Sequence, residues 1–182
     1  MMSIIYIFWM YVFLFGIIGA MRGWAKELMV IFSVVTALAV TLLLERYVPL
    51  VRALAEPSTA TPDSLRSLFW IRTIILIALV YFGYQTVNIS RLAGKAARER
   101  LQDSLFGAVL GGVNGYLVAG TVLYNNHVAG YPYSHIISPA TDPAIVASIT
   151  RMMEIMPPRF LAEPQIYFAV ILILIFILVV YI

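Results

Sequence analysis

Few residues of this chain could carry chemistry. The sequence contains no cysteine, which excludes disulfides, thiolate metal sites and iron–sulfur clusters. Its two histidines, His127 and His135, lie between apolar runs beside tyrosine and proline. A hydrogen-bonded loop histidine is the expected role, and an interfacial ligand at His127 is the alternative. The motifs of zinc peptidases, phosphate-binding loops and dinucleotide folds are absent. These residues predict neither an enzyme nor a cofactor or metal site.

Charged residues gather in two short segments that each follow a long apolar run. The members of this inner-face charge cluster are Arg22, Lys26, Glu27, Arg91, Lys95, Arg98, Arg100 and Asp103. If both segments lie on one side of a membrane they can meet beneath it, and we then expect Glu27 to pair with Arg98 or Arg100. Asp103 is expected to pair with Arg22. The cluster could equally hold anionic lipid headgroups, at about 1 kcal/mol per basic residue, or form a solvated positive face with no further task.

The composition indicates a membrane protein. Of the 182 residues, 62% are apolar and 12% are charged, and the mean hydropathy is +0.94. Soluble domains are about half apolar and a quarter charged. A helix needs about 20 apolar residues to cross the hydrocarbon core of a bilayer. Five apolar stretches approach this length, at residues 2–20, 28–44, 67–90, 104–124 and 165–182. We therefore predict an all-α membrane protein with five transmembrane helices.

The distribution of lysine and arginine predicts the orientation of these helices, because positively charged loops stay on the cytoplasmic side. The two segments of the charge cluster hold six basic residues within a short length. The loops on the opposite side hold five, which acidic residues balance. We therefore expect the N-terminus outside and the C-terminus in the cytoplasm. The net charge of +3 reports this topology, and no nucleic-acid partner is expected.

The connections between the spans carry further signals. Residues 45–66 contain several prolines, serines and threonines and are predicted to form a loop, and residues 91–103 can form a short helix. Arg72 lies near the start of the third span, where it is expected to reach the headgroups, with pairing to a carboxylate such as Glu45 or Asp63 as the alternative. Residues 142–156 alternate apolar and charged faces at helical spacing, which predicts a short amphipathic helix on the outer surface.

Small residues recur every four positions along the fourth span, from Gly107 to Ala119. Such a series forms one stripe on a helix and lets another backbone approach closely. The first span repeats the spacing in two registers, one through Gly16 and one through Gly19, and is the expected partner. Asn114 lies one residue off the stripe, where its amide could bond across to another helix; a functional amide in a pore is the alternative. The predicted packing residues are Gly16, Ala20, Gly107, Gly111, Asn114, Gly115 and Ala119.

Two of these patterns together resemble the colicin V production protein (CvpA) family of bacterial inner-membrane proteins. One is the turn Arg22-Gly23-Trp24-Ala25-Lys26-Glu27 after a first apolar helix, and the other is Asp103 followed by the glycine series of the fourth helix. The likeness covers roughly residues 1–125. Where the family usually has an arginine after the aspartate, this chain has Ser104, so the contact of that arginine is not implied. The recurrent positions that carry over are Arg22, Gly23, Glu27, Asp103, Gly107, Gly111 and Gly115.

The resemblance implies a multi-pass membrane protein linked to toxin production or export and to upkeep of the envelope, with no established catalytic activity. We expect a CvpA-like four-helix membrane domain at residues 1–125, an outer loop with the amphipathic segment at 126–164 and a fifth transmembrane helix at 165–182. Such a protein would act in the bacterial inner membrane through helix packing and through contacts with lipids, with other membrane subunits or with itself. The alternative is an accessory structural subunit of a larger respiratory or photosynthetic (reaction centre–antenna) complex, and a channel or carrier is a third hypothesis.

Overall fold

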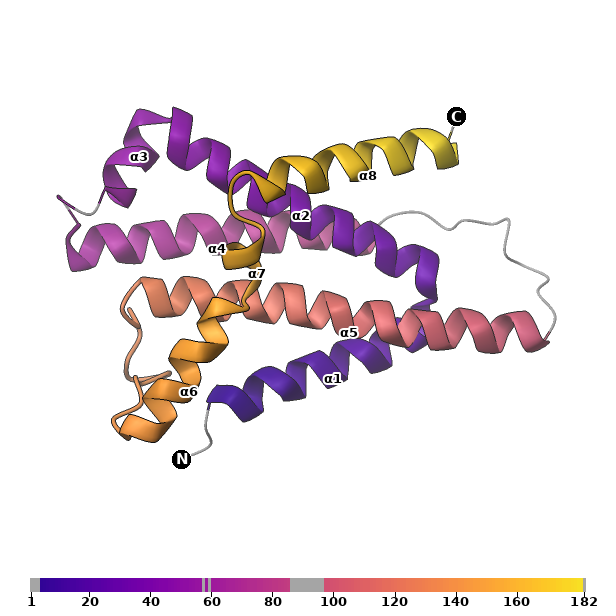
Figure 1. Cartoon of the computed structure of the whole chain (residues 1–182), viewed down its shortest axis with the longest axis horizontal. Coiled ribbons are helices and arrows are strands. Elements are labelled where there is room, and N and C mark those ends of the chain that lie inside the picture. The colour runs from indigo at the N-terminus through magenta and orange to yellow at the C-terminus, as the bar shows by residue number, and fades with distance from the viewer. Residues whose placement is uncertain (1–3, 57, 59, 86–96, 182) are drawn as a thin grey trace.

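The computed structural model describes residues 4–56, 58, 60–85 and 97–181 of the chain. All regular structure in these ranges is α-helical (Figure 1). The elements, in chain order, are α1 (Ile4–Arg22), α2 (Trp24–Tyr47), α3 (Pro49–Ala55), α4 (Pro62–Gln85), α5 (Ala97–Val128), α6 (Pro143–Glu154), α7 (Pro157–Phe160) and α8 (Gln165–Tyr181).

Four of the described helices, α1, α2, α4 and α5, are long and apolar enough to cross a membrane. The all-α membrane class that the composition predicted is therefore confirmed. α8 is also strongly apolar, but it is shorter, with 17 residues. The prediction of a fifth span depends on this helix.

The long helices run along the long axis of the molecule (Figure 1). α5 is the longest, with 32 residues; it lies along α1 and also contacts α2, α4 and α7. α2 in turn contacts α4 and α8. The α1–α2 turn lies at one end of the bundle, whereas α3, α6 and the N-terminal end of α1 lie at the other (Figure 1). The central helix α5 therefore links the two ends.

Prolines and one glycine decide where several helices begin. Pro49 and Pro62 are the first residues of α3 and α4, a position at which the missing N–H of proline costs no hydrogen bond. The prediction of a continuous loop at 45–66 was therefore wrong, because α2 continues to Tyr47 and α3 follows. At the other end, Gly23 alone separates α1 from α2. Its backbone φ of 86° is one that residues other than glycine rarely adopt.

The segment predicted as a separate short helix at 91–103 differs from the structure in its described part. From Ala97 onward it forms the first turns of α5, and residues 91–96 lie outside the described residues. No glycine or proline stands between Ala97 and Phe106, so nothing ends the helix there. α5 thus extends beyond the predicted fourth span at both ends.

Buried apolar side chains form three clusters that join helices. The central cluster joins α2, α4 and α5 around Val34 and Leu76. A second joins α1 and α5 to α6 around Phe8 and Met153, and a third joins α2 to α8 around Ile166. α6, which forms within the segment predicted as amphipathic, therefore packs its apolar face on α1 and α5 in addition to lying at the end of the bundle.

Candidate functional site

α1 and α5 cross with their backbones in contact. A Cβ atom built on Gly19 would meet the carbonyl oxygen of Gly107 and would lie 2.7 Å from the Cα of Gly111. In the reverse direction, a Cβ on Gly111 would lie 2.8 Å from the Cα of Gly19. A Cβ on Gly115 would lie 2.8 Å from the Cβ of Phe15. Real side chains do not approach so closely, so only glycine permits this crossing.

The other predicted packing residues lie around the crossing. A Cβ on Gly16 would meet a carbonyl of α5 at 3.4 Å, which is ordinary contact, so the register through Gly19 is the tighter one. The carbonyl oxygen of Ala20 accepts a hydrogen bond from the hydroxyl of Ser104 at 2.9 Å. Ala119 lies farther along α5, against the apolar cluster that joins α1 and α5 to α6. The stripe therefore contacts α1 over most of its length.

A carboxylate is buried where α1, α2 and α5 meet. The side chain of Glu27 has no exposed surface, and its Oε1 accepts a hydrogen bond from Nη1 of Arg22 at 2.6 Å. Asn114 of α5 donates from Nδ2 to Oε2 of Glu27 at 2.7 Å and to the backbone oxygen of Glu27 at 2.9 Å. Burial of a charge is tolerated only where it is paired and hydrogen-bonded. Arg22 pairs the charge of Glu27, and Asn114 adds a hydrogen bond to its carboxylate.

The same arginine reaches a fourth helix. Nη2 of Arg22 donates to the backbone oxygen of Tyr84 at 3.1 Å, and its guanidinium carbon lies 4.2 Å from the centre of the Tyr84 ring, in cation–π geometry. We call Arg22, Glu27, Tyr84 and Asn114 the Glu27 cluster. Tyr84 is absent from the residues predicted from the sequence, because an aromatic residue near the end of an apolar span looks like an ordinary interfacial anchor. Within the described residues, Oδ1 of Asn114 and the hydroxyl of Tyr84 are buried without a hydrogen-bond partner.

The contacts of the two acidic side chains differ from the predicted pairs. Glu27 pairs with Arg22, because the single-residue break at Gly23 brings the last residue of α1 beside the first turn of α2. Asp103 accepts a hydrogen bond from the backbone N–H of Trp24 at 3.1 Å. This contact places a negative charge at the N-terminus of α2, where the helix dipole favours it.

Of the other basic residues in the inner-face charge cluster, Lys26 and Arg100 form no ion pair within the part of the chain that the structure describes. Lys26 is half-buried in the first turn of α2, and Arg100 is exposed in the first turns of α5. Outside the described residues lie Arg91, Lys95 and the side chain of Arg98.

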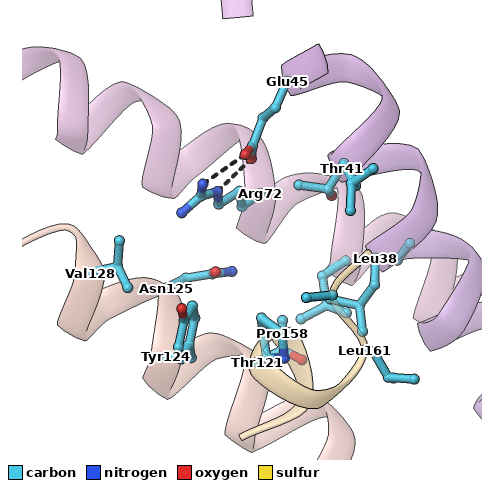
Figure 2. A pocket seen from close by; sticks show the side chains of 14 residues that line it. Leu38, Thr41, Glu45, Arg72, Thr121, Tyr124, Asn125, Val128, Pro158 and Leu161 are labelled. Carbon is cyan, nitrogen blue, oxygen red and sulfur yellow. Dashed lines mark hydrogen bonds and ion pairs between the residues drawn. The ribbon is translucent and has the colours of Figure 1, made fainter. Parts of the chain in front are cut away.

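A second ion pair lies toward the opposite end of the bundle. Nε and Nη2 of Arg72 donate to the two carboxylate oxygens of Glu45 at 2.7 and 2.9 Å (Figure 2). Both side chains are mostly buried, with 17% and 22% of their surface exposed. The expectation that Arg72 reaches the headgroups was therefore wrong, and the alternative with Glu45 is observed. The reason is that α2 and α4 pack in antiparallel directions and bring the two residues to the same level.

The histidines offer no site among the described residues. No group of three or more His, Asp or Glu residues that could hold a metal ion is found in the part of the chain that the structure describes. His127 lies in the last turn of α5 and not in a loop, and its Nδ1 is 3.1 Å from the hydroxyl of Tyr131. Burial raises the pKa of the Tyr131 hydroxyl. His135 is exposed.

The fold and these contacts define a multi-pass helical membrane protein whose buried polar side chains join its helices to one another. The model of the Colicin V production protein family matches residues 5–147. Because this match covers well over half of the chain, the protein belongs to the Colicin V production protein family, and the resemblance noted in the sequence is confirmed. The matched range includes α1 to α5 and the start of α6, whereas α7 and α8 lie beyond it. No curated protein and no solved structure matches the chain.

Proposed function

We propose that this chain is a non-enzymatic protein of the bacterial inner membrane that supports toxin production, toxin export or upkeep of the envelope through contacts with lipids and other membrane proteins. Membership of the Colicin V production protein family supports the proposed link to toxin production. One observation carries the mode of action: Glu27 is fully buried and joins three helices through Arg22 and Asn114. Its carboxylate offers no surface to a substrate, so its role is to hold helices in place.

The proposal includes a fifth transmembrane helix. Glu163, just before α8, pairs with Arg46 near the end of α2 at 2.6 Å. Phe176, thirteen residues after Glu163, packs its ring on Phe32, fourteen residues before Arg46, with ring centres 5.4 Å apart. α8 therefore runs antiparallel to α2 with a matching rise per residue. Because α2 is long enough to cross a bilayer, this side-by-side course supports five spans (Figure 1).

With five spans the two termini lie on opposite sides, and the positive-inside rule favours a cytoplasmic α1–α2 turn. We expect the basic residues of the inner-face charge cluster other than Arg22 to attract anionic lipid headgroups, at about 1 kcal/mol each. These residues are Lys26, Arg91, Lys95, Arg98 and Arg100.

The proposed protein partners are other membrane subunits or further copies of the chain, which the exposed apolar faces of the helices would meet within the bilayer. α8 exposes Phe168, Leu172 and Ile175, for example. The same faces are equally suited to lipid. An accessory role in a larger respiratory or photosynthetic complex stays a prediction, because no contact of the described residues bears on it.

A complementation experiment tests this function. In a bacterium that makes colicin V but lacks its own member of the family, expression of the chain should restore secreted toxin activity, measured as killing of a sensitive strain. Glu27→Ala should lose this activity, because α1, α2 and α5 are no longer joined at the turn. Glu99→Ala, which changes an exposed carboxylate, should retain it.

Immunoblots of the membrane fraction separate loss of function from loss of protein. If the chain reaches the membrane in normal amounts but restores neither toxin release nor resistance of the envelope to detergent, the proposed function is wrong. If Glu27→Ala is present at the normal level and fully active, the Glu27 cluster does not carry the function.

A further inference from the structure

A partly polar cavity lies among α2, α4, α5 and the segment around α7, beside the Arg72–Glu45 ion pair (Figure 2). Its volume is about 220 Å³. This is several times the ~30 Å³ that a water molecule occupies and less than the volume of pockets for drug-sized ligands. Its walls combine the ion pair with polar Thr41 and Asn125 and with apolar side chains such as Leu38. The cavity therefore suits a small molecule with both polar and apolar parts.

Asn125 is the side chain that points to a ligand. It lies in the last turns of α5 and is only 4% exposed. Its carboxamide points from α5 into the cavity (Figure 2), and no other described residue holds it by a hydrogen bond. An amide that faces a cavity can both donate hydrogen bonds to a molecule there and accept them from it. A molecule in the cavity that both accepts and donates hydrogen bonds would satisfy it.

The ion pair leaves hydrogen-bonding capacity on both partners. A guanidinium has five N–H donors, and Glu45 engages only Nε and Nη2 of Arg72. The third nitrogen of Arg72 lies on the side away from Glu45 (Figure 2). Each carboxylate oxygen of Glu45 can accept a second hydrogen bond. The site therefore presents a cationic and an anionic group whose charges sum to zero.

We propose that the cavity binds a small zwitterion of the α-amino acid type with a short aliphatic side chain. The carboxylate of the ligand binds the free edge of Arg72, and its ammonium group binds Glu45. The amide of Asn125 donates a hydrogen bond to the ligand carboxylate and accepts one from the ligand ammonium group. A ligand with a single charge would leave an uncompensated charge in a mostly buried site, which is unfavourable. A zwitterion keeps the site neutral, and the wall around Leu38 accommodates its aliphatic end. This binding site goes beyond the proposed function and does not depend on it.

Titration of the purified full chain in detergent with three related probes tests the proposal. L-valine carries both charged groups, isovalerate lacks the amine, and isobutylamine lacks the carboxylate, while all three share the same aliphatic end. By calorimetry we expect saturable binding of valine at one site, and binding of each single-charge probe that is weaker roughly tenfold or more. Absence of saturable valine binding, or equal binding of either single-charge probe, overturns the proposal.

Two neighbouring asparagines supply matched variants. Asn125→Leu removes the amide that faces the cavity, and Asn126→Leu removes a buried amide that lines a separate apolar groove along α1 and α5. We expect Asn125→Leu to weaken valine binding roughly tenfold or more and Asn126→Leu to leave it unchanged. Unchanged binding in Asn125→Leu would place any site elsewhere and overturn the assignment. The comparison of the three probes on the wild-type chain decides the proposal even if a variant does not fold.

Discussion

At the scale of single residues, Glu27 decides how three helices meet. Burying a carboxylate in apolar surroundings lowers the free energy of unfolding by roughly several kcal/mol unless the charge is paired and hydrogen-bonded. Arg22 neutralises the charge, and Asn114 of α5 donates one hydrogen bond to the carboxylate and one to the backbone oxygen of Glu27. The carboxylate is stable only when α1, α2 and α5 are all in place. Its burial therefore selects this arrangement of helices over others of similar apolar area.

Glu27→Ala should destabilise the chain by about 3 kcal/mol, the order observed when one partner of a buried ion pair is removed. The loss lies at the lower end of that range because Arg22 is 19% exposed and keeps its contact with the ring of Tyr84. Equilibrium unfolding in mixed detergent micelles, followed by circular dichroism, measures the change. Glu99→Ala, at an exposed position, should change the unfolding free energy by less than about 0.5 kcal/mol. Equal stability of the two variants would contradict the structural role of Glu27.

The sequence could identify these charged residues but not their partners. A charge beside an apolar span is unusual, so Arg22 and Glu27 could be singled out. Their pairing depends on the one-residue break at Gly23, which no hydropathy pattern reveals. Arg72 illustrates the same limit, because its position in the span indicated the headgroups. The sequence left Glu45 and Asp63 open as alternative partners, and only the packing of α2 on α4 decides for Glu45.

At the scale of helices, the α1–α5 crossing predicts opposite effects for two neighbouring glycines. A Cβ on Gly111 would meet the carbonyl oxygen of Phe15 and lie 2.8 Å from the Cα of Gly19, and both neighbours are backbone. A Cβ on Gly112 would meet nothing within 4 Å. Gly111→Ala should therefore destabilise the chain by about 1–3 kcal/mol through overpacking. Gly112→Ala should be neutral or stabilise it by up to about 1 kcal/mol, because alanine favours the helix.

Thermal unfolding of the two glycine variants in the same detergent measures this difference. Each variant adds one methyl group to adjacent positions of one helix, so each is the control for the other. If Gly111→Ala unfolds at the same temperature as Gly112→Ala, the backbones of α1 and α5 are not in contact at this position.

The contact that holds the start of α8 to α2 should respond to pH. Glu163 accepts hydrogen bonds from the hydroxyl of Tyr167 at 2.5 Å and from Arg46 at 2.6 Å. These bonds, that of Tyr167 first, lower the pKa of the Glu163 carboxyl below its ordinary value of 4.5. Because the pKa of Glu163 is lower in the folded state than in the unfolded state, the ionised carboxylate stabilises the fold at any pH above the unfolded-state pKa. That stabilisation is lost as the pH falls through the folded-state pKa.

We therefore expect the wild-type chain to be slightly more stable than Glu163→Gln at neutral pH, with the difference closing as the pH falls below 4.5 and through the folded-state pKa of Glu163. The effect is small because the groups are exposed and solvent screens them. Unfolding temperatures of both chains across this pH range measure it. A difference that stays constant from neutral to acid pH would show that the charge of Glu163 is not responsible.

The helices that are long and apolar enough to cross a membrane were predictable, whereas their ends were not. The thickness of a bilayer fixes how long an apolar stretch must be, so α1, α2, α4 and α5 follow from hydropathy. The ends depend on local geometry. The prolines of residues 45–66 indicate a loop in the sequence, although proline is as well suited to the first turn of a helix, and α3 begins at Pro49.

At the scale of the whole molecule, the surface is that of a protein surrounded by lipid. Large apolar side chains such as Phe13, Met21 and Phe168 are 71%, 84% and 69% exposed. Such extensive apolar surface is rare on soluble monomers. It follows directly from composition and could be predicted. The cavity around Asn125 could not, because its walls come from separate helices whose relative positions no spacing in the sequence specifies.

The five-span topology can be tested by labelling, and a chain without native cysteine is well suited to it. Ser134→Cys, at an exposed position between α5 and α6, should react with a membrane-impermeant maleimide in spheroplasts. Glu99→Cys, at the start of α5, and a cysteine added after Ile182 should react only once the membrane is permeabilised. If the C-terminal cysteine reacts together with Ser134→Cys while Glu99→Cys stays protected, α8 lies on the outer surface and the chain has four spans. That outcome would require α8 to leave the membrane while it follows α2 from Arg46 to Phe32, so we expect the C-terminal cysteine to be protected.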